Sequence, residues 1–139
     1  MIFRIVGSVA GTIGVFELPR SPSALGVAVE SALESHFARH REPVQYLAAF
    51  RSSSGTVFAI ERVTLTQIML WLPDQESVRR AADRAGIAAM LSVPWPAGRS
   101  GKYGRISSLK AIPELVDAQL LKVAVTTAGD AMSLAESIV

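Results

Sequence analysis

The chain contains no cysteine and no asparagine among its 139 residues. Without cysteine, disulfide bonds, thiol nucleophiles and thiolate metal sites are excluded, while the redox compartment stays undetermined. Charged residues are also scarce, at 19% against roughly 25% in an average soluble domain. Hydrophobic residues make up 50% of the chain. A buried face between identical copies would accommodate this surplus, so we expect a homo-oligomer.

Long hydrophobic runs are missing as well. The longest uncharged stretches are residues 5–16, 63–73 and 85–98, and each is shorter than the roughly 18 residues of a membrane-spanning helix. The first stretch follows Arg4, as in a secretory signal, but it contains three glycines and no leucine-rich core. We therefore expect no membrane association and assign the protein to the cytoplasm.

Acidic residues are absent from residues 84–113, although the whole chain is nearly neutral, with a formal net charge of +2. That total is too small to indicate nucleic-acid binding by itself. The window, however, collects five cations, and arginine, the commonest cation in the chain, binds anions through two parallel hydrogen bonds. These cations are Arg84, Arg99, Lys102, Arg105 and Lys110.

Three glycine-basic-any triplets follow one another at residues 98–106 within this window. Glycine allows close approach of the backbone to a ligand, and a cation recurs at every third position. We predict that residues 94–108 form one long basic loop that binds an anion; a solvated connection without a specific partner is the alternative. The predicted anion-binding residues are Arg99, Lys102, Tyr103, Arg105, Ser107 and Ser108, with Trp95 stacking on a base.

Two glycine patterns invite comparison with nucleotide-binding motifs, and both differ from them. Gly101-Lys102 does not belong to a Walker A loop, because Pro96 stands where that motif needs glycine and Tyr103 where it needs serine or threonine. The glycines of residues 7–14 are spaced GxxxGxxG rather than GxGxxG, and no helix is predicted after them. We therefore expect no nucleotide cofactor, and the sequence indicates no other cofactor.

Catalytic and metal-binding motifs are also lacking. His36 and His40 are the two histidines, and on one helix their spacing would allow them to share a metal. The HExxH glutamate is missing, so we predict no metal site and expect both histidines to interact with the helix C-terminal dipole. No Gly-x-Ser-x-Gly elbow occurs. A non-catalytic protein is therefore favoured over an enzyme.

Periodicity predicts a single α+β domain over residues 1–139, with an antiparallel or mixed sheet of about five or six strands. Apolar residues at every fourth position from Leu25 to Phe37 predict a long helix over about residues 22–40. Three β-like runs within residues 44–72 predict an antiparallel meander at the centre of the sheet. The remaining expected elements are helices over about 74–86, 113–119 and 128–139 and strands over 1–6, 15–18, 87–93 and 120–126.

Three functions remain open at this point. The first is a small non-catalytic module that binds nucleic acid or a phosphorylated ligand through its basic loop. The second is a small enzyme on an anionic substrate, with the loop as a lid, Arg99 or Arg105 as a clamp and His36 as acid or base. The third is a protein-interaction or inhibitor module, because an apolar surface with a basic loop also suits a protein partner.

Overall fold

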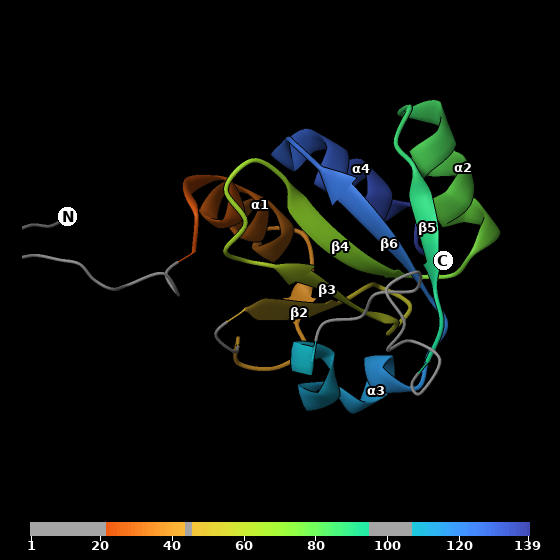
Figure 1. Ribbon diagram of the computed structural model, residues 1–139, viewed down its shortest axis with the longest axis horizontal. Coiled ribbons are helices and arrows are strands. Elements are labelled where there is room, and N and C mark those ends of the chain that lie inside the picture. The colour runs from red at the N-terminus through yellow and green to blue at the C-terminus, as the bar shows by residue number, and fades with distance from the viewer. Residues whose placement is uncertain (1–21, 44–45, 95–106) are drawn as a thin grey trace, which may run out of the picture.

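The structure is a computed structural model that describes residues 22–43, 46–94 and 107–139. In this part of the chain six strands form one antiparallel sheet in the order β1-β2-β3-β4-β6-β5 (Figure 1). The expected α+β class and its sheet are thereby confirmed, and the strands predicted within residues 1–18 lie outside the described residues. The strands are β1 (Ala38–Arg39), β2 (Leu47–Arg51), β3 (Val57–Glu61), β4 (Ile68–Pro73), β5 (Ala89–Ser92) and β6 (Leu120–Val125).

The described helices match three of the four expected helices closely. Thr127 caps the last one by accepting the backbone N–H of Asp130 at 3.1 Å. None of the helices in the described segments is long and apolar enough to cross a membrane. The helices are α1 (Ala24–Glu34), α2 (Glu76–Arg84), the 3₁₀ helix η3 (Ser107–Ala111), α3 (Pro113–Val116) and α4 (Ala128–Glu136).

The first helix is shorter than predicted, because α1 ends at Glu34 rather than near residue 40. The chain then turns, and Phe37 donates its backbone N–H to the carbonyl of Leu33 at 2.8 Å. The ring of Phe37 still reaches the core, where it meets Phe58 edge to face at a centroid distance of 5.4 Å. The spacing of the apolar residues therefore predicted correctly that they contact the core. The last of them, Phe37, reaches the core from the turn after α1 and not from the helix itself.

Both faces of the sheet are covered. Successive residues of a strand point to opposite faces, so the central strands supply two separate cores, one under α1, α2 and α4 and one under η3 and α3. Burial on both faces explains why β2, β3 and β4 read as continuous apolar runs. The larger core includes Phe50, Phe58, Ile60, Leu70, Leu121 and Leu134, and the smaller one Ala49, Ala59, Trp71, Leu109, Ile112 and Leu115.

The start of α1 lies very close to the chain just after β3. Ser23 caps the helix by accepting the N–H of Gly26 at 2.9 Å, and it donates its own N–H to the carbonyl of Arg62 at 3.1 Å. A Cβ atom built at residue 26 would stand only 2.1 Å from that carbonyl oxygen. Glycine is the residue that permits this approach, because it has no Cβ.

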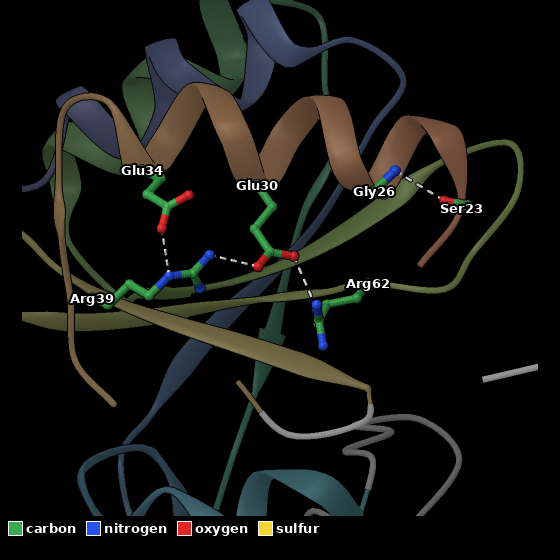
Figure 2. Close-up of polar contacts among 6 residues, drawn as sticks. All are labelled: Ser23, Gly26, Glu30, Glu34, Arg39 and Arg62. Atoms are coloured by element: carbon green, nitrogen blue, oxygen red, sulfur yellow. Dashed lines mark hydrogen bonds and ion pairs between the residues drawn. The ribbon is translucent and has the colours of Figure 1, made fainter. Parts of the chain in front are cut away.

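One carboxylate ties α1 to β1 and to the chain just after β3 (Figure 2). Glu30 accepts a hydrogen bond from Arg39 of β1 at 2.7 Å and another from Arg62 at 2.8 Å, and its side chain is only 10% exposed. Glu34 accepts a further bond from Arg39 at 2.8 Å. The hydrogen bond to Glu34 is the largest cause of the raised pKa of Arg39. The two arginines are thus held by carboxylates of α1.

Replacing Gly26 with alanine tests the close approach of α1 to the carbonyl group of Arg62. The added methyl group meets backbone that cannot rotate away, so we expect the free energy of unfolding to fall by about 1–3 kcal/mol, as for other overpacked sites. Urea unfolding followed by circular dichroism measures the change. Gly129→Ala is the matched control, because its Cβ meets only the Thr127 hydroxyl at 3.9 Å. A loss of stability in both variants alike would contradict the assignment of the effect to the Arg62 contact.

Replacing Glu30 with glutamine tests the carboxylate that joins α1 to the sheet. The charge between two arginines is lost, so we expect the free energy of unfolding to fall by about 2 kcal/mol or more, between the values for exposed and buried ion pairs. Glu34→Gln, at a side chain that is 53% exposed, should cost less than about 1 kcal/mol. Equal losses in the two variants would show that Glu30 has no special part in holding α1.

Candidate functional site

Most of the predicted anion-binding loop lies outside the described residues. The proposed contacts of these side chains therefore stay predictions. The first two residues of η3 belong to the predicted set, but only their backbone is described. The side chains concerned are Trp95, Arg99, Lys102, Tyr103 and Arg105, with Ser107 and Ser108 at the start of η3.

The structure does describe both ends of this loop, and they meet the same face of the sheet. At the first end, Ser92 of β5 is fully buried and pairs in register with Leu120 of β6. At the second end, Leu109 of η3 is fully buried. Leu120 and Leu109 belong to the same small core under η3 and α3. The loop therefore leaves and returns beside one hydrophobic cluster.

Basic side chains from the β1–β2 edge gather where the loop returns. Arg41 donates a hydrogen bond to the carbonyl of Ala111, the last residue of η3. Arg51 donates to His40 Nδ1 at 2.9 Å, and His40 Nε2 lies 3.0 Å from a carboxylate oxygen of Glu114 in α3. Sequence reasoning missed this group, and its signal was the basic run at residues 39–41.

The hydrogen bonds determine which nitrogen of His40 carries the proton. Arginine can only donate, so Nδ1 of His40 must accept from Arg51 and is unprotonated. Nε2 then carries the proton and donates it to Glu114. The pKa of Glu114 is lowered, first by a hydrogen bond from its own backbone N–H and then by the one from His40. The carboxylate therefore stays ionised and is bound by the imidazole of His40.

The two histidines do not share one helical turn, because α1 ends before both of them. Ser35 Oγ donates to the carbonyl of Ala32 at 2.7 Å, so the 2.9 Å bond between this oxygen and His36 Nδ1 has the imidazole as donor. Nε2 of His36 is left as an acceptor. In residues 22–43, 46–94 and 107–139, no three histidine, aspartate or glutamate side chains gather in a way that could hold a metal ion.

His36 also lines a cavity of about 340 Å³ between the ends of α1 and α4. Its lining also includes Arg51, Glu136, Phe37 and Ile138, and the guanidinium of Arg51 is bonded to His40. The cations Arg99 and Arg105, which the enzyme hypothesis combines with His36, lie outside the described residues. Their joint action with His36 therefore stays a prediction.

A partly buried acid lies at the edge of the small core. Glu61, at the end of β3, accepts a hydrogen bond from the indole N–H of Trp71 at 3.0 Å. The ammonium of Lys122 lies 5.4 Å from the centre of the Trp71 ring. Burial raises the pKa of Glu61, and the hydrogen bond and the charge of Lys122 oppose this effect. Such acids occur both at functional sites and in structural networks, and here the indole contact gives Glu61 a structural role.

Comparison of the chain with protein-family models, with curated proteins and with solved structures found no match.

Replacing Glu61 with glutamine tests the effect of burying this acid. Its pKa in the folded protein lies above the ordinary value of 4.5, so folding disfavours the ionised form, and the protein loses stability as pH rises from about 4.5 through the raised pKa. Glutamine can still accept from Trp71 without a charge. We expect the stability of Glu61→Gln relative to the natural protein to increase over this window, as measured by unfolding at a series of pH values.

Glu114→Gln is a control in which the stability difference from the natural protein should change with pH in the opposite direction. The pKa of Glu114 is lowered, so its contribution to stability is present above 4.5 and lost as pH falls through the lowered pKa. The glutamine variant should therefore become less stable relative to the natural protein as pH rises. A pH-independent difference for Glu61→Gln would contradict the burial of its charge.

Proposed function

We propose that this protein is a small, non-catalytic, cytoplasmic binding module that engages nucleic acid or a phosphorylated ligand through residues 94–108. The observation that carries the proposal is the absence of acids from residues 84–113, in a segment whose two ends pack beside one core. A segment held at both ends has fewer conformations to lose on binding than a free tail of the same length, so the entropic cost is lower.

The surroundings of the returning end support binding of an anion. Arg41 and Arg51 are exposed and lie beside η3 and α3, so they extend the cationic surface beyond the loop. The carboxylate of Glu114 in α3 is already bound by His40, which reduces its repulsion of a phosphate. Arginine suits phosphate because its guanidinium can donate two parallel hydrogen bonds.

The aromatic residues of the loop favour nucleic acid among the possible anions. Trp95 and Tyr103 stand within a few residues of Arg99 and Lys102. Proteins that bind single strands combine a basic groove with aromatic rings on which bases stack. A free phosphorylated small molecule would use the cations but would gain less from two rings.

A small enzyme on an anionic substrate is the second candidate. The specific observation in its favour is the cavity of about 340 Å³ that His36 lines together with Glu136. An imidazole of this kind can act as a general base. This candidate requires turnover, whereas the proposed binding module requires only affinity.

Replacing Arg99, Lys102 and Arg105 together with alanine tests the proposed function. Fluorescence anisotropy with labelled single- and double-stranded oligonucleotides measures affinity across a salt series. For three phosphate contacts, the affinity of the natural protein should fall roughly 20- to 40-fold between about 50 and about 200 mM salt. The triple variant should bind weakly at low salt and lose most of this dependence.

A second triple variant separates local contacts from overall charge. Arg79, Arg80 and Arg84 are exposed on α2, and their replacement by alanine removes the same number of charges. This variant should keep most of the affinity. The proposal is wrong if the natural protein has no affinity at low salt, or if both triple variants weaken binding equally. Binding of inorganic phosphate without binding of oligonucleotides would point to the phosphorylated ligand instead.

A further inference from the structure

The imidazole of His40 lies between a cation and a carboxylate. Its Nδ1 accepts a hydrogen bond from the guanidinium of Arg51 in β2 at 2.9 Å, and its Nε2 lies 3.0 Å from a carboxylate oxygen of Glu114 in α3. The side chain of His40 is only 10% exposed. While it is neutral, this histidine therefore links the end of β2 to α3.

Protonation of His40 removes one of these two contacts. An imidazolium carries a proton on both ring nitrogens and has no acceptor, so no orientation of the ring accepts the hydrogen bond from Arg51. Two positive groups would then face each other at the present distance of 2.9 Å, which is unfavourable. The contact with Glu114 becomes stronger, because a neutral donor is replaced by a charged one.

Arg51 is the partner that has to move when His40 is protonated. The backbone of His40 is fixed to β2, because its N–H donates to the carbonyl of Ala49 at 2.9 Å, and Glu114 binds the ring. Arg51 is exposed, so its guanidinium can turn into water without the cost of burying a charge. The ring therefore stays in place and the cation leaves it.

Charged side chains of the neighbouring segments also act on this proton. The cations oppose protonation of His40 and the carboxylates favour it. Arg51 and Glu114 bond to the ring itself and have the largest effect. These charged side chains are Arg51 of β2, Glu114 of α3, Lys110 of η3 and, on the segment of His40 itself, Arg39, Arg41 and Glu42, with Arg39 offset by Glu30 and Glu34 of α1.

We propose that His40 is a pH-sensitive switch on Arg51: the neutral imidazole holds the guanidinium, and the protonated imidazole releases it to bind an anion at the returning end of the loop. Histidine is the side chain that ordinarily changes charge between about pH 5 and about pH 8. The charge of Arg51 also acts on Glu114 and contributes to the lowered pKa of that carboxylate, but an imidazolium on Glu114 offsets this attraction. The release of Arg51 is independent of the proposed function, whereas the use of Arg51 for a phosphate group rests on it.

Nuclear magnetic resonance of the imidazole nitrogens tests the release of Arg51. At about pH 8 His40 should carry its proton on Nε2 alone, and at about pH 5 both nitrogens should be protonated. Arg51→Gln removes the opposing charge, so the midpoint of this transition should rise by about half a pH unit or more, and Glu114→Gln should lower the midpoint. The chain has two histidines, and His36→Gln assigns their signals.

Arg84→Gln is the matched control, because Arg84 is exposed at the end of α2 and its replacement removes the same charge. This variant should leave the midpoint of the His40 transition unchanged. A proton on Nδ1 at about pH 8, or a midpoint that moves no further in Arg51→Gln than in Arg84→Gln, would overturn the proposal. Circular dichroism checks that each variant is folded.

Fluorescence anisotropy with a labelled single-stranded oligonucleotide tests the use of the released cation. Between about pH 8 and about pH 5.5, the affinity should rise about two- to fivefold more in the natural protein than in Arg51→Gln, as expected for one added exposed ion pair. Equal gains in the two proteins would contradict the use of Arg51 for the anion. Absence of binding at both pH values would contradict the proposed function, and the resonance measurement would still decide the release of Arg51.

Discussion

The candidate site depends on the two ion pairs that the carboxylate of Glu30 forms. The carboxylate binds Arg39 and Arg62 and so joins α1 to β1 and to the chain after β3. The position of β1 in turn sets the two residues that follow it, of which His40 contacts Glu114 and Arg41 contacts Ala111. Through these contacts a buried charge on one side of the sheet helps to position the helices at which the basic loop returns.

In the described structure, the partners of the arginines distinguish those that stabilise the fold from those that could bind an anion. Where arginines lie beneath α1, carboxylates hold them, and the charge of one group offsets that of the other. At the returning end of the loop, Arg41 bonds to a backbone carbonyl and Arg51 to an imidazole. Neither partner carries a negative charge, although the charge of Arg51 also acts on Glu114 and lowers the pKa of that carboxylate. This difference favours the second group as a surface for an anion.

Local patterns predicted much of the fold and little of the site. The meander of β2, β3 and β4 and the helix α4 depend on neighbours close in sequence, so propensity and spacing were sufficient to predict them. The end of α1 was predicted wrongly, because Phe37 keeps a helical spacing while its backbone turns. Strand β1 was not predicted at all: two residues carry no periodic signal, and the strand forms where Phe50 and Arg51 offer a paired edge.

The sequence by itself determined the α+β class, the order of the main elements and the acid-free window, because each follows from residue type and short-range spacing. Only the tertiary structure decided that Arg41 contacts Ala111 and that His40 lies between Arg51 and Glu114. It also decided that β5 is the edge strand next to β6. The physical reason is distance along the chain: these contacts join segments that are far apart in sequence, and burial of the two cores brings them together.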